Sequence, residues 1–183
     1  ISTDGQELGS HSFSHLHFRE QGVTSVDFLA DMDAVERLWS ERFNAVPVSL
    51  VYPRNQSSFI DQLKNTSIKI WRGPEPAWFY NCTSQRDNTL FPRALRLIDS
   101  VNPFVRRASS RKNPGIARAS LFVRFALSEP LWKLQFKRIR YEFNSLMPGD
   151  TLHLWWHPHN LGFDTKKTFN RLLNVLDEIK YAC

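Results

Sequence analysis

Residues 24–52 read TSVDFLADMDAVERLWSERFNAVPVSLVY, and this stretch indicates the fold class. Between 26 and 43, apolar side chains recur every three or four residues; they are Val26, Leu29, Met32, Val35, Leu38 and Trp39. That spacing predicts an amphipathic helix with Thr24 or Ser25 as its N-cap. The β-branched run at 46–52, closed by Pro53, predicts a strand directly after the helix.

The same alternation continues along the chain. We expect strands at 67–71, 119–127 and 151–156, and helices at 57–64, 89–101, 129–146 and 166–181. Residues 102–118 are rich in proline and basic side chains and predict a long loop. Alternating strands and helices are typical of an α/β protein with parallel strands, whose ends meet at one face where catalytic residues collect.

The bulk composition is that of an ordinary globular protein. The chain has 183 residues, 42% of them hydrophobic and 23% charged, which suffices for one domain with a core and excludes a disordered chain. It has no apolar run of about 18 residues, so we expect no membrane span. The start at Ile1 has neither methionine nor a signal pattern and suggests a processed or truncated chain.

The net charge and the cysteine content limit which classes of function fit this chain. The formal charge is +6, but basic residues are spread along the chain, with one dense cluster at 106–112. A single basic loop favours a solvated surface over nucleic-acid binding, and an anionic sugar would use the same charge. The two cysteines, Cys82 and Cys183, form neither a metal pair nor a disulfide framework, which favours a reduced cytosolic protein.

All six histidines lie near the two ends of the chain. His11, His15 and His17 form the first cluster, and His153, His157 and His159 form the second. Histidine binds transition metals and exchanges protons near neutral pH. The two clusters therefore predict one metal site built by folding the ends together.

In the first cluster, His11 and His15 are four residues apart, a spacing that places two imidazoles on one side of a turn. Gly9 allows close backbone approach, and the serines at 10, 12 and 14 are small polar residues suited to orienting imidazoles. We predict His11 and His15 as metal ligands. His17 is either a third ligand or a loop residue.

In the second cluster, His157 directly follows an apolar strand and precedes Pro158. A histidine at a strand end is placed to donate or accept a proton. The alternative is a partly buried histidine whose ring bonds to backbone. His153, inside the expected strand, is explained more simply by packing.

Three segments resemble motifs of the polysaccharide deacetylase family, that is, the NodB-homology carbohydrate esterases of family four. Gly5-Gln6-Glu7-Leu8-Gly9-Ser10-His11-Ser12-Phe13-Ser14-His15 resembles its metal-ligand motif. Leu154-Trp155-Trp156-His157-Pro158 resembles its last motif, and Tyr52-Pro53-Arg54-Asn55-Gln56 resembles its arginine motif, without the usual glycine after the proline. The resemblance runs from about residue 5 to 180 and is similar to a bacterial subgroup linked to surface polysaccharide synthesis.

The resemblance implies an α/β fold, a distorted (β/α) barrel, over a single domain at 1–183. It implies a metal-dependent hydrolase that removes an acetyl group from an acetylated sugar or polysaccharide, in O-antigen or capsule synthesis in the bacterial cytoplasm. The ion, zinc or else cobalt or nickel, would be held by His11 and His15. His157 would protonate the leaving amine and Arg54 would orient the base; the substrate-binding residues would be Trp155, Trp156, Arg72 and His159.

The chain departs from the family at its start. It lacks the Thr-Phe-Asp-Asp-Gly motif that supplies the base and the third ligand, and Asp4 lies only seven residues before His11. Either an N-terminal fragment completes the barrel's missing first strand–helix segment, or the protein is a non-catalytic carbohydrate-binding relative. A basic nucleic-acid-binding domain is a third hypothesis, which leaves both histidine clusters unexplained.

Overall fold

The computed structural model describes residues 7–73, 75, 77–80, 89–104, 116–118 and 121–182. Asp4, the motif residues Gly5 and Gln6, both cysteines and the basic cluster at 106–112 lie outside the described residues. The chain forms two compact units. Unit 1 contains the described residues up to 75 together with 116–118, and unit 2 contains 77–80, 89–104 and 121–182.

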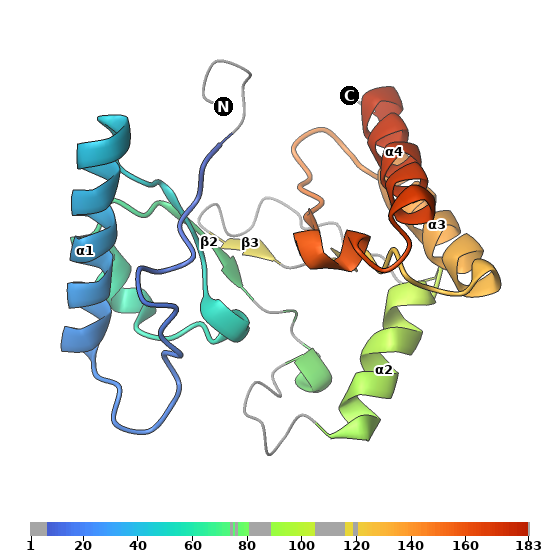
Figure 1. The fold of residues 1–183 in the computed structure, drawn as a ribbon. Coiled ribbons are helices and arrows are strands. Elements are labelled where there is room, and N and C mark those ends of the chain that lie inside the picture. The colour runs from blue at the N-terminus through green and yellow to red at the C-terminus, as the bar shows by residue number, and fades with distance from the viewer. Residues whose placement is uncertain are drawn as a thin grey trace. The chain divides into compact units, whose positions relative to one another are not determined.

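Unit 1 is a parallel sheet with one long helix (Figure 1). Helix α1 (Ser25–Phe43) begins at Thr24, whose side chain and that of Asp27 form a capping box. The sheet has the order β1-β2-β3, with β1 at Ser49–Val51, β2 at Ile70–Gly73 and β3 at Ile116–Arg118. Short 3-10 helices lie at Pro53–Asn55 and Ile60–Asn65.

The core of unit 1 lies where α1 packs on the sheet. One hydrophobic cluster joins Phe28, Met32 and Val35 of α1 to Leu50 of β1 and to the fully buried Tyr52. The helix expected from the sequence is confirmed, and Met32 and Val35 of its predicted apolar face are buried. Val26 and Leu38 of that face are exposed, and Phe28 is buried in their place.

Unit 2 consists of helices around a pair of parallel strands. Strand β4 (Leu121–Phe122) pairs with β5 (Leu154–Trp155). The helices are α2 (Leu90–Val101), α3 (Glu129–Asn144) and α4 (Thr165–Ala182), with 3-10 helices at Trp78–Tyr80 and Pro158–Leu161. Helices α3 and α4 lie side by side (Figure 1), over a core built on Val123, Phe125, Trp132, Ile139 and Val175.

The described residues form both helices and strands, and every strand pair among them is parallel, as expected. The loop expected at 102–118 is wrong at its end, because Ile116–Arg118 forms β3 and pairs with β2. Three residues are too few to show a strand period, and the pairing partner stabilises them. The distorted barrel and the single domain stay predictions.

Within the described part of the chain, no helix is long and apolar enough to cross a membrane.

Candidate functional site

The first histidine cluster follows a strand-like segment at the edge of the unit 1 sheet. Ser10 forms an isolated parallel bridge with Leu50: its N–H donates to Ser49 (2.8 Å), and its carbonyl accepts from Val51 (2.9 Å). At Gly9, an added Cβ would lie 2.5 Å from the Ser49 hydroxyl, so a side chain here would require the Ser49 side chain to move. The close approach expected at Gly9 is confirmed, and it places His11 at the carboxyl end of the sheet.

A buried carboxylate on α1 holds the loop between His11 and His15. Asp31 accepts hydrogen bonds from the backbone N–H groups of Phe13 (2.8 Å) and Ser14 (2.9 Å), and from the Ser14 hydroxyl (2.5 Å). The loop needs this support because Ser12 and His15 have φ of 64° and 55°, a region that L residues rarely occupy. Such conformations persist where surrounding contacts over-determine them, often at functional sites.

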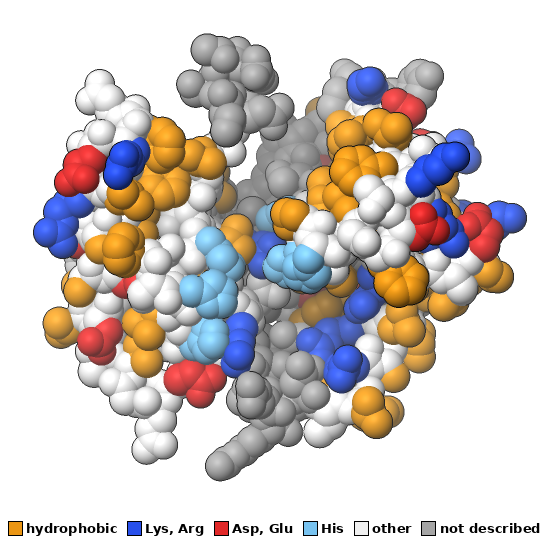
Figure 2. Space-filling view, viewed as in Figure 1, with side chains coloured by type: hydrophobic (Ala, Val, Ile, Leu, Met, Phe, Trp, Pro, Cys, Tyr) orange, Lys and Arg blue, Asp and Glu red, His pale blue; other side chains and the backbone are white. Residues whose placement is uncertain are grey.

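The imidazoles of unit 1 form one cluster, and Figure 2 shows histidine side chains gathered on its surface. The ring centroids of His11 and His15 are 5.0 Å apart, and those of His15 and His17 are 5.4 Å apart. Nδ1 of His11 lies 2.7 Å from the carbonyl oxygen of Val51. A carbonyl only accepts, so Nδ1 carries the proton and Nε2 keeps a free lone pair.

Two of the three imidazoles, those of His11 and His17, have a lowered pKa. Burial lowers the pKa of His11; the Val51 hydrogen bond raises it in part, and the charges of His15 and Arg72 lower it further. Burial also lowers the pKa of His17, as do the charges of Arg54 and His15, while Glu20 raises it. Neutral imidazoles are the form that binds metal.

Arg54, in the turn after β1, and Arg72, in β2, were both predicted as site residues, and both lie at the same end of the sheet. Arg54 and Asn55 have φ of 51° and 55°, and Arg54 is exposed. Arg72, at the end of β2, is buried and donates from Nε (3.1 Å) and an Nη (2.7 Å) to the Asn55 side-chain oxygen. Burial lowers the pKa of Arg72 to about 10, so it remains a cation at neutral pH.

Unit 1 brings together His11, His15, Arg54 and Arg72, and His17 lies beside them. Among the residues that the structure describes, no group of three or more His, Cys, Asp or Glu side chains is placed to hold a metal ion. The metal-ligand role of His11 and His15 stays a prediction.

In unit 2, the second cluster lies at the carboxyl end of β5. The Trp155 ring stacks on Phe122 at 4.4 Å between centroids and contacts the His157 ring edge-on at 5.8 Å. His157 is exposed, and its backbone N–H donates to Asn160 (3.0 Å). The ring of His159 stacks on His157 at 5.1 Å and 10°. Three of the predicted residues, Trp155, His157 and His159, thus share one surface.

Trp156 points the other way. Its ring packs edge-on against Phe125, 5.8 Å between centroids, in the unit 2 core. A role for Trp156 in binding substrate stays a prediction, and its packing gives it a structural role as well.

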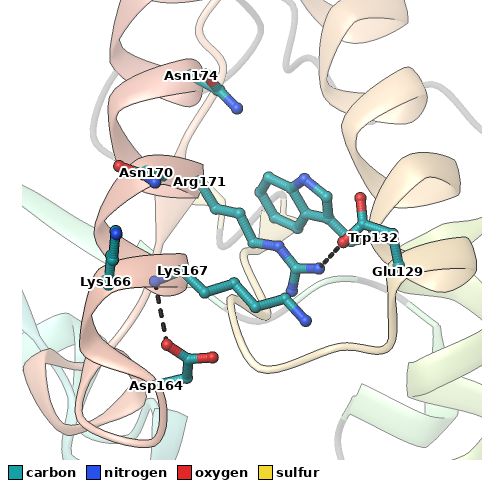
Figure 3. A pocket seen from close by; sticks show the side chains of 8 residues that line it. All are labelled: Glu129, Trp132, Asp164, Lys166, Lys167, Asn170, Arg171 and Asn174. Atoms are coloured by element: carbon teal, nitrogen blue, oxygen red, sulfur yellow. Dashed lines mark hydrogen bonds and ion pairs between the residues drawn. The ribbon is translucent and has the colours of Figure 1, made fainter.

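An open pocket of about 400 Å³ lies between α3 and α4 (Figure 3). At its base the buried Arg171 donates to the carbonyls of Phe125 and Leu127, both at 2.7 Å, and to Glu129 at 2.7 Å. The Arg171 guanidinium also lies over the Trp132 ring at 4.9 Å. Its charge is therefore used in holding α4 to α3, and no predicted site residue lines this pocket.

No family model, curated protein or solved structure was found to match the chain.

The sequence analysis did not predict Asp31 as a residue of the site, and it predicted no function for Asn55. A signal for Asp31 was present: it occupies a helical position between Phe28 and Met32 that the periodicity assigns to the buried face. An acidic residue at a buried position requires a hydrogen-bonding partner, here the backbone of the histidine loop.

Proposed function

We propose that this protein is a metal-dependent deacetylase that removes an acetyl group from an acetylated sugar, in bacterial surface polysaccharide synthesis in the cytoplasm. The observation that carries the proposal is the pair His11 and His15, held in a strained loop by a buried carboxylate. The motifs quoted above support it, as do the parallel strands whose ends carry the motif residues. With it we propose the distorted (β/α) barrel fold.

The imidazole nitrogens of His11 and His15 are the type of ligand atom that binds divalent transition metals. His11 offers Nε2 because its Nδ1 bonds to the Val51 carbonyl, and its lowered pKa favours the neutral ring, in which Nε2 is unprotonated. Catalytic zinc uses three protein ligands, of which this cluster supplies two. When bound, zinc, cobalt or nickel would polarise the acetyl carbonyl and acidify a water molecule.

The remaining site residues would bind the sugar and protonate the leaving amine. His157, exposed at a strand end and flanked by aromatic rings, would donate a proton to the leaving amine. Arg54 would orient the base, and Arg72, fixed by Asn55, would bind a sugar oxygen. Trp155 and His159 would contact the sugar ring, since flat aromatic surfaces suit the apolar faces of sugars.

One observation favours a second candidate, a non-catalytic carbohydrate-binding relative. Among the described residues, no group of three or more His, Cys, Asp or Glu side chains is placed to hold a metal ion, and the nearby Asp31 carboxylate accepts three hydrogen bonds from the loop. A protein that only binds a sugar needs neither a metal ion nor a catalytic base.

Acetate release from N-acetylated oligosaccharides in the presence of Zn²⁺, measured alongside Zn²⁺ binding, tests the proposal. We expect His11→Ala and His15→Ala to lose both metal and turnover, and His157→Ala to keep the metal and slow turnover by at least 100-fold. His153→Ala, also on a histidine of unit 2, is the matched control and should leave turnover unchanged. Sugar binding without acetate release would favour the second candidate, and unchanged turnover in His157→Ala would exclude the acid assignment.

A further inference from the structure

The pocket between α3 and α4 lies at the end of the unit 2 strands that the predicted proton donor follows. Strand β4 leads into the first turn of α3, and β5 leads through His157 and the 3-10 helix at Pro158–Leu161 into α4. Glu129 and Trp132, in the first turn of α3, form one wall of the pocket, and residues of α4 between 166 and 174 form the other. Ligands of parallel sheets bind beyond the carboxyl ends of the strands, where this pocket also lies.

The floor of the pocket is fixed by contacts among its own residues. The buried Arg171 donates to two backbone carbonyls and to the Glu129 carboxylate, and its guanidinium lies over the Trp132 ring. Trp132 is only 5% exposed and stacks on Phe136, with 5.8 Å between centroids. A ligand would therefore meet polar groups instead of an aromatic face, on a floor that needs no further ordering to bind it.

Four polar side chains on the α4 wall are available to a ligand. Those of Lys166, Lys167, Asn170 and Asn174 make no hydrogen bond or ion pair with any residue that the structure describes. The contact of Lys167 with Asp164 is made by its backbone N–H, at 3.2 Å. Figure 3 shows the Lys167 side chain extending from α4 toward α3 and Asn174 directed into the space between the helices.

The charge of the pocket favours an anion. Lys166, Lys167 and Arg171 line it, against the two carboxylates of Glu129 and Asp164. Both carboxylates already accept hydrogen bonds, Glu129 from Arg171 and Asp164 from the α4 backbone. The N-terminal turns of α3 and α4, which form the two walls, add positive partial charge.

We propose that this pocket binds a sugar unit that carries one carboxylate, of the hexuronic acid type. The two lysines would bind the carboxylate, and the two asparagine amides, which both donate and accept, would bind hydroxyl groups. A volume of about 400 Å³ is in the range of small-molecule sites.

A carboxylate fits this pocket better than a phosphate. The carboxylates of Glu129 and Asp164 would repel a doubly charged group more strongly than a singly charged one. A guanidinium fork is the group best matched to phosphate, and that of Arg171 is already bonded to the protein.

The pocket as an anion site rests on unit 2 alone, whereas the statement that the acidic sugar is part of the substrate rests on the proposed function. Because the pocket and His157 follow the same pair of strands, an acidic unit bound here would belong to the same saccharide as the acetylated unit. The substrate would then be an acidic oligosaccharide or polysaccharide instead of a single neutral sugar.

Calorimetry on the full chain, without added metal, tests the pocket with D-glucuronate, D-glucose and D-glucose 6-phosphate. We expect glucuronate to bind at least tenfold more tightly than glucose, and more tightly than the phosphate. Lys166→Gln combined with Lys167→Gln should remove most of that difference, and Asn174→Ala should weaken glucuronate binding at least threefold. All three positions are exposed, so the variants should keep the wild-type melting temperature.

The matched control is Lys180→Gln, an exposed lysine on the same helix that pairs with Asp177 outside the pocket. It should leave glucuronate affinity unchanged. Equal affinity for glucuronate and glucose, a difference that survives the double lysine variant, or tighter binding of glucose 6-phosphate would each overturn the proposal.

His157→Ala separates this pocket from the predicted acetyl site. We expect glucuronate to bind this variant as it binds the wild type. A loss of binding in His157→Ala, with no effect of the lysine variant, would place the sugar at the predicted acetyl site and overturn the proposal. None of these measurements uses metal or turnover, so a failure of the deacetylase proposal would leave the result for the pocket intact.

Discussion

Asp31 binds Ser14 through two hydrogen bonds to the same carboxylate oxygen, from the backbone N–H at 2.9 Å and from the hydroxyl at 2.5 Å. Its other oxygen accepts from Phe13, so one buried side chain of α1 occupies the middle of the His11–His15 loop. His15, at the end of this loop, has a left-handed φ of 55°. We therefore expect the distance between the two imidazoles to depend on Asp31, which is not itself a predicted ligand.

Asp31→Asn should weaken Zn²⁺ binding at least tenfold. An amide presents an N–H₂ group to one of the two backbone donors, which leaves a buried donor unpaired at a cost of about 1–3 kcal/mol. Calorimetric titration with Zn²⁺ and thermal unfolding measure the two effects. Asp33→Asn is the control, since Asp33 is exposed on the same helix and pairs with Arg37, a contact worth little. Equal Zn²⁺ affinity in both variants would show that Asp31 does not position the histidines.

Arg138→Met should strongly destabilise unit 2. The Arg138 and Glu142 side chains form an ion pair with both side chains 0% exposed, and Arg138 also donates to the carbonyls of Asp99 and Asn102. Removing the guanidinium leaves a buried carboxylate, at a cost of about 3–5 kcal/mol. Urea unfolding followed by tryptophan fluorescence measures it.

The matched control for this measurement is Arg140→Met, two residues along the same helix. Arg140 is 58% exposed and pairs with Glu178, so its loss should cost no more than about 1 kcal/mol. Similar unfolding midpoints for the two variants would mean that the buried pair contributes little to stability.

Helix positions were predictable from the sequence, whereas the buried face of α4 was predictable only in part. The periodicity at 166–181 places Phe169, Leu172, Leu173, Leu176 and Ile179 on one face. Leu172 and Ile179 do pack against the core, but the other three are exposed. Arg171 and Val175 are buried instead, because the Arg171 guanidinium binds carbonyls distant in sequence. An argument from periodicity treats arginine as a polar, outward-facing residue. It cannot take into account hydrogen-bond partners that lie more than forty residues away in the sequence.

For the site, residue spacing predicted that His11 and His15 lie together, but not what holds them in place. Arg72 reaches the same sheet edge. The buried helix position of Asp31 indicates that it needs a partner, but nothing in the sequence shows that the partner is the histidine loop, or that Asn55 binds Arg72. That the two histidine clusters form one site stays a prediction, since they lie in two units.

The Glu129–Arg171 pair predicts a pH-dependent stability. The hydrogen bond from Arg171 is the main cause that holds the pKa of Glu129 below its ordinary value. Burial opposes it, and the charges of Arg171, Lys167 and Lys133 lower the pKa further. A lowered carboxyl pKa means that the unfolded state binds the proton first. The stabilisation is therefore complete above about pH 5 and is lost as the pH falls through the lowered pKa.

Melting temperatures of the wild type and Glu129→Gln, measured from pH 7 to pH 3, test this linkage. The difference between the two proteins should shrink as the pH falls below about 4.5. Glu178→Gln, which removes a different surface partner of an arginine, controls for the loss of one negative charge. A difference that stays constant to pH 3 would show that the pair contributes nothing through its charge.

Substitutions at Asn55 should separate backbone strain from the positioning of Arg72. Asn55 has φ of 55° and accepts both hydrogen bonds from the buried Arg72. Asn55→Gly keeps the left-handed backbone without strain, whereas Asn55→Ala adds about 1 kcal/mol or more of strain. Both remove the acceptor, so we expect equal losses of sugar affinity with Ala the less stable variant. Unequal affinities that follow stability would instead mean that Asn55 acts only by shaping the turn.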